Sequence, residues 1–510
     1  MVIVGYIGIT LTILCFLFIC HTKTKRNSQV ITTWPIVGMF PGFVCNTRRL
    51  HDYVTQILKQ SGGTFEFKSP WFSKMDFIAT CDPKNVDHIL NRSFSNYIRG
   101  PEIKEIFEIL GDGIFNLDFD LWKLQKKMVQ SMINNTKFEL LVEKTVTQKV
   151  IENLVPVLDH LSEHGLEADM QDLFQRFTFD NICMLILGFD PRYLSVEFPE
   201  FVLGNAIDDM EEAQLYRHIW PAWFWKLQKW LQIGKEKRLK RAWDTMDSFL
   251  YQCIYTKKEN LSRSKTLLEE KEWDLLTVLM TEEEEEVQNV ARRKSDKFLR
   301  DFVLNLLLAG SDSTSAALTW FFWLVATNPS EETQLLEEIK SNLPEKEVGK
   351  WRCFSSQELN KFVYLHAALC ETLRMYPSLP INHRTTVEAD ILPSGHRVPP
   401  RTSVMIPYYT MGRMEEIWGE DCLEFKPGRW ITDQGRLINV PSYKFTAFNS
   451  GPKSCPGKNV AFIQMKIAAI IVLQNYRVQV VEGHSVSPSS SVLLHMHGGM
   501  KVRITKRCFG

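Results

Sequence analysis

The chain has 510 residues, of which 45% are hydrophobic and 24% charged, and 60 basic residues balance 60 acidic ones to a formal net charge of zero. This length and composition indicate a folded protein with a large core, and the charge balance gives no reason to expect a nucleic-acid partner. The 11 cysteines are scattered, with no Cys-x-x-Cys pair. We therefore expect no disulfide framework and a folded part that lies in a reducing compartment.

The first predicted element is a transmembrane anchor within residues 1–21. Residues 2–20 carry no charge, and a helix of this length spans roughly 28 Å, close to the hydrocarbon thickness of a bilayer. The alternative is a cleavable signal peptide, which the absence of a charged leading segment and of a small-residue cleavage site disfavours. Lys23, Lys25 and Arg26 follow the apolar stretch. Positive charge on that side predicts a single-pass protein whose remainder faces the cytosol.

A stiff connector is predicted next. Residues 22–45 combine the basic flank with Pro35, Gly38, Pro41 and Gly42, which disfavour a regular helix or strand. Beyond them no low-complexity linker or internal repeat divides the chain. We expect residues 46–510 to form one large domain.

Hydrophobic periodicity predicts a fold that is mostly α with small β sheets. Amphipathic helices are expected over 142–161, 166–187 and 296–327, within a largely helical stretch that reaches about residue 376. Alternating stretches at 404–408 and 492–497 predict short strands nearer the C-terminus.

Two histidine pairs need an interpretation. His160 and His164 match a H-x-x-E-H metal-protease pattern, but they stand at the end of a predicted helix directly before Gly165. A histidine in a last helical turn suits the helix dipole, so we favour a helix end over a metal site. His495 and His497 share one face of the predicted late strand, where we expect them to pack.

The predicted helix 296–327 has an unusual centre. At about 1.5 Å per residue it would extend roughly 48 Å, with Ser295 or Asp296 as its N-cap. Residues 309–314 (AGSDST) are small and polar inside an apolar run, so they leave room beside a flat cofactor, and their hydroxyls are expected to open the helix locally. Helix packing would explain the small residues alone. It does not explain Asp312, whose burial costs several kcal/mol without a partner.

The most informative segment is FNSGPKSCPGKNVAFIQ at 448–464. Cys455 precedes a predicted helix over about 457–476, and Pro456 stands where a first-turn proline is tolerated. Free backbone N–H groups and the positive end of the helix dipole are expected to favour thiolate over thiol at this sulfur.

The neighbours of this cysteine strengthen the interpretation. Gly451 and Gly457 allow a tight turn and the close approach of a flat partner, and Phe448 is suited to shield the sulfur from water. Lys453 supplies a cation for a carboxylate at the rim. The alternative is a buried structural cysteine, which accounts for none of these neighbours.

Taken together, Phe448-x-x-Gly451-x-x-x-Cys455-x-Gly457 resembles the haem-binding pattern of the cytochrome P450 superfamily, and the similarity extends over essentially the whole chain. The resemblance implies that fold, with haem b as cofactor and the Cys455 thiolate as ligand to its iron. It assigns proton delivery to Asp312 and the hydroxyls of Ser313 and Thr314, where Ser313 replaces the usual threonine. The implied propionate partners are Trp122, Lys126, Arg384 and Lys453, with lysine standing for arginine at Lys126 and Lys453. The Glu-x-x-Arg pair and its arginine partner are implied to form a structural network of Glu371, Arg374 and Arg429.

The segment LPSGHRVPPRTSVMIPYYTMGRMEEIWGEDCLEFKPGRW is similar to plant hydroxylases of fatty acids and long-chain alkanes, nearest to mid-chain alkane hydroxylases of cuticular wax. This implies insertion of one oxygen atom from O₂ into an aliphatic C–H bond. No dinucleotide-binding motif is present, so we expect electrons from NADPH through NADPH–cytochrome P450 reductase. The other expected partners are the lipid bilayer of the endoplasmic reticulum and a hydrophobic small-molecule substrate.

Two alternatives stay open. Departures from the pattern at Ser311, Ser313, Gly428 and Pro456 and in SLPINHRTT leave the substrate class open, and the alternative reaction is oxidation of an aromatic specialised metabolite. The same departures also allow a degenerate family member that binds haem but serves only as a scaffold or sensor.

Overall fold

The computed structural model describes residues 33–34, 36–73, 75–263, 273–281, 295–343 and 353–507. The predicted anchor at 1–21 and most of the basic flank lie outside these residues. Within the described ranges, no helix combines the length and the apolar character that a bilayer crossing requires.

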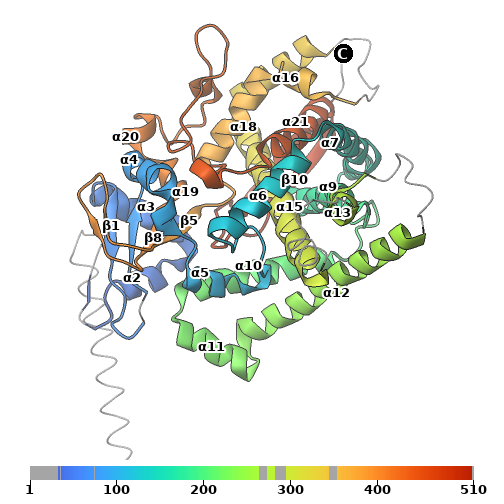
Figure 1. Cartoon of the computed structure of the whole chain (residues 1–510). Helices are drawn as coiled ribbons and strands as arrows, with labels where there is room; N and C mark the ends of the chain where they lie inside the picture. The colour runs from blue at the N-terminus through green and yellow to red at the C-terminus, as the bar shows by residue number, and fades with distance from the viewer. Residues whose placement is uncertain are drawn as a thin grey trace, which may run out of the picture.

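Helices make up most of the molecule, as predicted (Figure 1). The longer helices are α3 (Leu50–Gln60), α6 (Phe119–Ile133), α7 (Thr136–Lys149), α8 (Val155–Glu163), α9 (Met170–Leu187), α10 (Val202–Ile219), α11 (Ala222–Leu231), α12 (Gly234–Arg263), α15 (Asp296–Thr327), α16 (Pro329–Asn342), α18 (Val363–Met375) and α21 (Lys458–Asn475). The shorter ones are α2 (Phe40–Cys45), α4 (Pro83–Asp87), α5 (Pro101–Ile106), α13 (Leu275–Thr281), α17 (Ser356–Leu359), α19 (Tyr408–Met411) and α20 (Glu415–Trp418).

The strands form three small sheets. The five-stranded sheet has the order β1 (Thr64–Phe67), β2 (Phe77–Thr80), β8 (Ser403–Pro407), β5 (Ile381–Thr386), β3 (Tyr97–Ile98), and its β2–β8 pair is parallel while its other pairs are antiparallel. The three-stranded sheet has the order β4 (Glu167–Asp169), β10 (Lys501–Lys506), β9 (Tyr476–Val480), and β6 (Asp390–Ile391) pairs with β7 (Arg397–Val398). The mostly α fold class with small sheets is confirmed.

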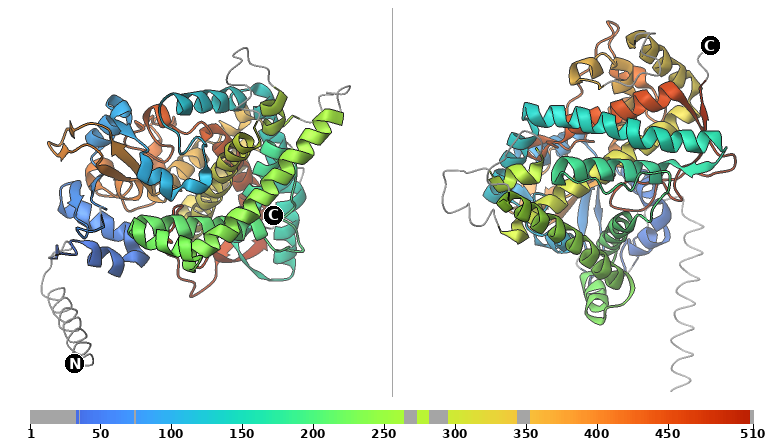
Figure 2. Two further views of the ribbon diagram at one scale, coloured as in Figure 1. Left: turned by 60° about the horizontal axis from the view of Figure 1, so that its bottom comes forward. Right: turned by 90° about the vertical axis from the view of Figure 1, so that its right-hand side faces the viewer.

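Helix α15 runs through the centre of the helical region and packs against α9, α12, α18 and α21 (Figures 1 and 2). Its predicted bounds, 296–327, are confirmed, and the Ser295 hydroxyl caps it by accepting a hydrogen bond from the Phe298 N–H at 3.2 Å. Leu304, Leu318 and Phe321 are fully buried on this helix. The hydrophobic effect thus fixes α15 in the core, where it can serve as one wall of an internal site.

The structure corrects two local predictions and refines a third. Residues 40–45 form helix α2, because Pro41 stands in its first turn, where proline needs no hydrogen-bonded N–H. Residues 167–169 at the start of the predicted helix 166–187 are strand β4, which pairs with β10. Residues 142–161 are helical as predicted, although the stretch from Val150 to Leu154 is a π-helical segment.

The strand predicted at 492–497 is also wrong. The Leu494 N–H donates to Ser378 O, and Leu494 O accepts from the Trp320 indole, so tertiary partners replace those of a neighbouring strand. His497 is exposed, whereas His495 is buried beside two carboxyl groups rather than packed among apolar side chains. His160 and His164 do stand at the end of α8 as predicted, followed by Gly165 at φ 61°.

Candidate active site

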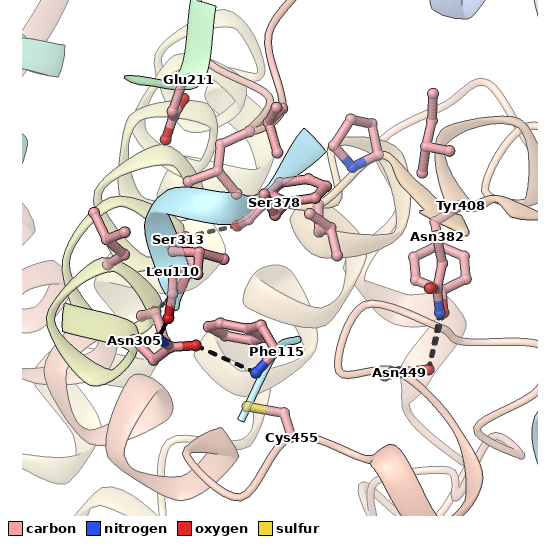
Figure 3. A pocket seen from close by; sticks show the side chains of 18 of the residues that line it. Leu110, Phe115, Glu211, Asn305, Ser313, Ser378, Asn382, Tyr408, Asn449 and Cys455 are labelled. Carbon is pink, nitrogen blue, oxygen red and sulfur yellow. Dashed lines mark hydrogen bonds between the residues drawn. The ribbon is translucent and has the colours of Figure 1, made fainter. Parts of the chain in front are cut away.

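An internal cavity of about 500 Å³ lies between α15, α10, α6, β5 and the loop that precedes α21. Cys455 borders it, together with Ser313 of α15 and Asn382 of β5. Figure 3 shows the Cys455 sulfur and the Ser313 side chain facing the same space. Much of the remaining wall is apolar and comes from residues such as Phe107, Ile114, Ile182, Ile207 and Leu306.

The loop that presents Cys455 is held by its own backbone. Gly451 has φ 67°, and a Cβ there would collide with the carbonyl oxygen of Leu90, so this position requires glycine. The Cys455 N–H donates to Phe448 O at 2.8 Å, and α21 begins three residues later. Gly457 has an ordinary φ of −83°. Only the first of the two glycines therefore performs the predicted tight turn.

The surroundings of Cys455 act on its thiol in opposite directions. Its side chain has accessible surface, but that surface belongs to the internal cavity rather than to the outside of the protein. Burial raises the pKa of the thiol, and the Gly457 N–H with the charges of Lys126 and Lys458 lowers it. The helix N–H thus acts in the predicted direction, while burial gives the net rise in the pKa of the thiol. A metal cation at the sulfur would reverse the balance.

Two lysines connect helix α6 and the cysteine loop. Lys126 Nζ donates to Ser454 O at 2.8 Å and to Pro452 O, so it holds the loop directly. Lys453 Nζ donates to Leu117 O at 3.2 Å, while burial and then the charge of Arg384 lower its pKa to about 8. Both ammonium groups lie over the Trp122 ring, at 5.7 and 5.3 Å from its centroid.

Two arginines complete this cationic region. Arg384 is buried on β5, where its Nη1 donates to His383 O at 3.2 Å and its Nε has no hydrogen-bond partner within the described residues. Arg99, which follows β3, also has a buried Nε without such a partner, and its guanidinium lies 4.7 Å from the Phe107 ring centroid. Burial and then the charge of Arg384 lower the pKa of Arg99 to about 9. The site thus gathers more positive charge than its own carboxylates neutralise.

Helix α15 supplies hydroxyl groups to the cavity without a break in its helical structure. Ser313 and Thr314 line the cavity, and the Ser313 hydroxyl donates to Ala309 O at 2.6 Å. The predicted local opening of the helix is therefore wrong, because the Ser313 hydroxyl adds a bond to an intact helical turn. Gly310 is closely packed, since a Cβ there would collide with Ile182. Asp312 is buried but does not line the cavity.

Comparison with known proteins identifies the family. The sequence model described as "Cytochrome P450" matches residues 29–501. The chain belongs to the cytochrome P450 family. The resemblance found in the sequence is confirmed: the protein is a monooxygenase of a family that uses haem with an axial cysteine thiolate. Such P450 monooxygenases use redox partners and hydrophobic substrates.

Three plant relatives align over nearly the whole chain. Alkane hydroxylase MAH1 of Arabidopsis thaliana is 41% identical over 507 residues, covering 98% of this chain and 99% of the relative. Cytochrome P450 86B1 of the same species is 38% identical over 507 residues, covering 98% and 89%. Noroxomaritidine synthase 2 of Narcissus pseudonarcissus is 38% identical over 509 residues, covering 98% and 97%.

The residues around the cavity of this P450 fit haem. The cofactor is flat and apolar with two carboxylates, and the cavity offers a sulfur, apolar walls and cationic side chains. The decisive feature is that the Nε atoms of Arg99 and Arg384 have no partner among the described residues, because a buried donor without an acceptor is unfavourable until a ligand supplies one. Sequence reasoning missed Arg99, since a single arginine after a short strand carries no local signal.

A hydrogen-bonded chain in the same cavity was also missed. Asn382 donates to the Tyr408 hydroxyl at 2.6 Å, and the hydroxyl donates to Asn449 Oδ1 at 2.9 Å; Figure 3 shows these three side chains together. Asn449 Nδ2 donates to Lys453 O at 3.1 Å. This chain couples β5 to the cysteine loop. Asn449 has φ 61°, a conformation that asparagine tolerates better than most residues, and this was the only local signal.

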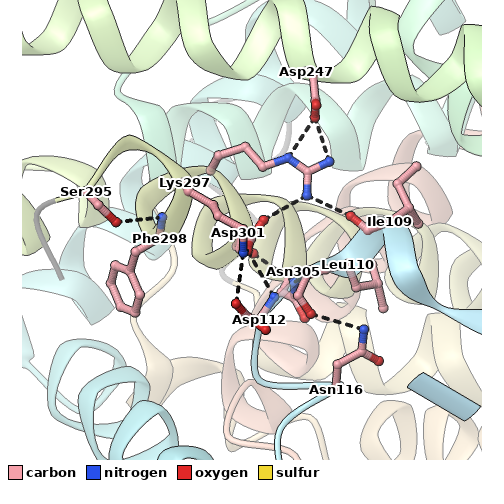
Figure 4. Close-up of polar contacts among 12 residues, drawn as sticks. Ile109, Leu110, Asp112, Asn116, Asp247, Ser295, Lys297, Phe298, Asp301 and Asn305 are labelled. Carbon is pink, nitrogen blue, oxygen red and sulfur yellow. Dashed lines mark hydrogen bonds and ion pairs between the residues drawn. The ribbon is translucent and has the colours of Figure 1, made fainter. Parts of the chain in front are cut away.

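Another polar network fixes the loop that covers part of the cavity (Figure 4). Arg300 Nη1 donates to Ile109 O at 2.7 Å. Asn305 Nδ2 donates to Leu110 O at 2.8 Å, and its Oδ1 accepts from the Phe115 N–H at 3.2 Å. Because Leu110, Phe115 and Asn305 all line the cavity, this network sets the shape of its wall.

Glu371, Arg374 and Arg429 meet in the core beside α18. Arg374 Nε lies 2.7 Å from Glu371 Oε2, Arg429 Nε lies 3.3 Å from Oε1, and the Trp430 indole donates to Oε2 at 2.9 Å. Arg374 also donates to Cys422 O at 2.7 Å. The carboxylate is thus surrounded by donors, and the network joins α18 to the loop that follows α20.

Proposed function

We propose that Cys455 is the axial ligand of the haem iron and that this monooxygenase hydroxylates an aliphatic C–H bond of a long-chain alkane or fatty acid. The observation that carries the proposal is a single cavity bordered by Cys455 on one side and by apolar side chains elsewhere. The name of one relative, alkane hydroxylase MAH1, supports the substrate class. It favours an active enzyme over a haem-binding scaffold or sensor.

Each neighbouring residue has a proposed role toward haem, which when bound supplies the iron at which O₂ is activated. Phe448 would shield the sulfur from water, and Gly457 would let the ring approach. Trp122, Lys126, Lys453 and Arg384, with Arg99, would hold the propionates by charge and hydrogen bonds. Lysine gives a point charge where arginine gives a bidentate fork, so Arg99 and Arg384 would contribute most of the directional bonding.

Proton delivery would involve Asp312, Ser313 and Thr314. The Ser313 and Thr314 hydroxyls line the cavity, where they would pass protons or position water. Ser313 lacks the methyl group that restricts a threonine rotamer, so we expect more peroxide release than a threonine would allow. Asp312 would act from behind this wall, since it is buried outside the cavity.

We infer that the domain comprises residues 46–510, behind an anchor at 1–21 and a hinge at 22–45, and that it faces the cytosol from the endoplasmic reticulum membrane. A membrane position gives a long-chain substrate direct access from the bilayer. NADPH–cytochrome P450 reductase is the proposed electron donor. The exposed Lys123 and Lys127 of α6, near the cysteine loop, would suit docking of an acidic partner.

The synthase relative supports a second substrate class. Noroxomaritidine synthase 2 is 38% identical to this chain, against 41% for alkane hydroxylase MAH1, and its name does not describe a hydroxylation. The cavity also carries polar side chains at Asn382, Gln214 and Glu211. An aromatic specialised metabolite with polar groups would use them, whereas an alkane would not.

The first experiment is the carbon monoxide difference spectrum of the reduced protein. We expect the thiolate band in the wild type and in Cys353→Ser, an exposed control, and its loss in Cys455→Ser. A folded wild-type sample without the band would overturn the haem-thiolate assignment. Product analysis with reductase, NADPH and a panel of n-alkanes, fatty acids and aromatic amines then decides the substrate class.

A further inference from the structure

Three buried titratable side chains meet where α10, α15 and residues 488–497 come together. They are Glu211, Asp312 and His495, and one ligand atom of each lies within 4.8 Å of the other two. His495 Nε2 is 3.4 Å from Glu211 Oε2. We refer to these three residues as the acid–histidine cluster.

The cluster has unused hydrogen-bonding capacity. Asp312 Oδ2 and both ring nitrogens of His495 are buried, and they have no hydrogen-bond partner within the part of the chain that the structure describes. The other Asp312 oxygen accepts from the Ser311 hydroxyl at 3.3 Å. Buried polar atoms are almost always paired in native proteins. Their concentration at one place therefore calls for a functional explanation.

The cluster lies between the active-site cavity and a second hollow. Glu211 lines the cavity, on the opposite side of it from Cys455 (Figure 3). Glu211 and His495 also line a second hollow of about 250 Å³, whose wall includes Glu212 and Arg238. The side chains of these last two residues are 47% and 52% exposed, so this hollow reaches the protein surface. One carboxyl group therefore borders both spaces.

The charges around the cluster favour the retention of protons. Burial lowers the pKa of His495, but the Glu211 carboxylate 3.4 Å away, with the charges of Asp312 and Asp208, raises it to about 9. Burial and then the charge of Glu211 raise the pKa of Asp312 well above its usual range, against the opposing charge of His495. Asp208 has a pKa raised to about 6 by burial, and Glu211, Asp209 and Asp172 contribute to the rise. The surroundings thus favour the protonated form of both His495 and Asp312.

We propose that the acid–histidine cluster is the proton inlet of this monooxygenase. It takes protons from water in the second hollow and delivers them to the active-site cavity through Glu211 and Asp312. The inference rests on the proposed function, because Asp312 is there assigned to proton delivery. Each turnover consumes O₂, two electrons and two protons, inserts one oxygen atom into a C–H bond and releases the other as water. A proton that leaves the cluster is replaced from solvent, so the cluster itself is unchanged.

Infrared spectroscopy tests the stored proton without any turnover. At pH 7 the wild type should show the C=O stretch of a buried protonated carboxylic acid, identified by its shift in D₂O. Asp312→Asn should remove this band, and Glu211→Gln or His495→Gln should displace it. Glu212→Gln is the matched control: it lies beside Glu211 and lines the second hollow but pairs with Lys235 and Arg238, so the band should stay. A wild type without the band would overturn the proposal.

Turnover with reductase and NADPH tests delivery. In Glu211→Gln and His495→Gln we expect at least a threefold larger share of NADPH electrons to appear as hydrogen peroxide, and a larger solvent isotope effect. Glu212→Gln should behave like the wild type. This ratio is measurable with any bound probe, including dodecanoic acid. Unchanged ratios in both variants would overturn the inlet.

Two further measurements distinguish a proton inlet from a damaged cavity and from a metal site. Product formation driven by iodosylbenzene needs no protons, so a loss in that reaction too would mean that the variants damage the cavity, which contradicts the proposal. Stoichiometric tight binding of Zn²⁺ in calorimetry, abolished by the three variants, would indicate a metal site and would also overturn it. The carbon monoxide spectrum reports on Cys455 independently. A failure of the haem assignment is therefore distinguishable from a failure of the inlet.

Discussion

Replacement of Arg99 by glutamine tests the cofactor site most sharply, because it should change two properties in opposite directions. The Arg99 guanidinium borders the cavity with a buried Nε that lacks a partner among the described residues. Its pKa falls from 12.5 to about 9, which at about 1.4 kcal/mol per pKa unit sets an upper limit of roughly 5 kcal/mol on the cost of keeping it charged. Arginine keeps its proton in proteins, so only an anion relieves that cost.

Water in the cavity and local relaxation reduce this limit. We therefore expect Arg99→Gln to raise the free energy of unfolding of the haem-free protein by about 1–2 kcal/mol. The same change should weaken haem binding by roughly tenfold to a hundredfold, since a hydrogen bond to a charged group contributes about 1.5–3 kcal/mol.

Two assays measure the two effects. Urea unfolding of the haem-free protein gives the stability change, and the rate of haem transfer to excess apomyoglobin gives the change in haem retention. Arg92→Gln is the matched control, because the Arg92 side chain is 77% exposed and pairs with Asp87 at the surface. We expect it to alter neither quantity. The reasoning is refuted if Arg99→Gln destabilises the haem-free protein or releases haem at the wild-type rate.

Three other substitutions have defined outcomes. Glu371→Gln should lower the free energy of unfolding by about 3–5 kcal/mol in a urea titration, because it leaves buried guanidinium groups uncompensated. The control is Glu424→Gln: the Glu424 side chain is 62% exposed, so this change should alter the free energy of unfolding by less than about 0.5 kcal/mol. The pKa of His495 is about 9 in the folded state rather than 6.5, so the folded state binds its proton more tightly than the unfolded chain does. As the pH rises from about 6.5 to 9, the free energy of unfolding of the wild type should therefore fall by up to about 3 kcal/mol relative to that of His495→Gln. A difference that does not change with pH would contradict this. Gly113→Ala, whose Cβ would collide with a neighbouring amide, should cost about 1–3 kcal/mol and alter substrate KM, while Gly428→Ala, with open space around it, should do neither.

The sequence predicted the elements whose signals are local. The apolar run of α15 and its Ser295 cap define that helix almost to the residue, since both signals lie within the segment itself. The spacing of Phe448, Gly451 and Cys455 likewise identified the loop and the family, because a turn at positive φ followed by a helix is a property of consecutive residues.

Long-range contacts decided what the sequence did not reveal. Residues 492–497 have the alternation of a strand, but the bonds of Leu494 to Ser378 and Trp320 satisfy its backbone in another way. The role inferred for His495 depends on its contact with Glu211, which lies far away in the chain. No periodicity encodes such a pair.

The sequence by itself thus determined the family, the central helix α15 and the cysteine that faces the cavity. The tertiary structure alone decided that Arg99 joins the cations around that cavity and that Asp312 lies beside His495 rather than in the cavity wall. The physical reason is that periodicity and capping act between neighbours in the chain, whereas burial and electrostatic pairing depend on which distant segments the fold brings together.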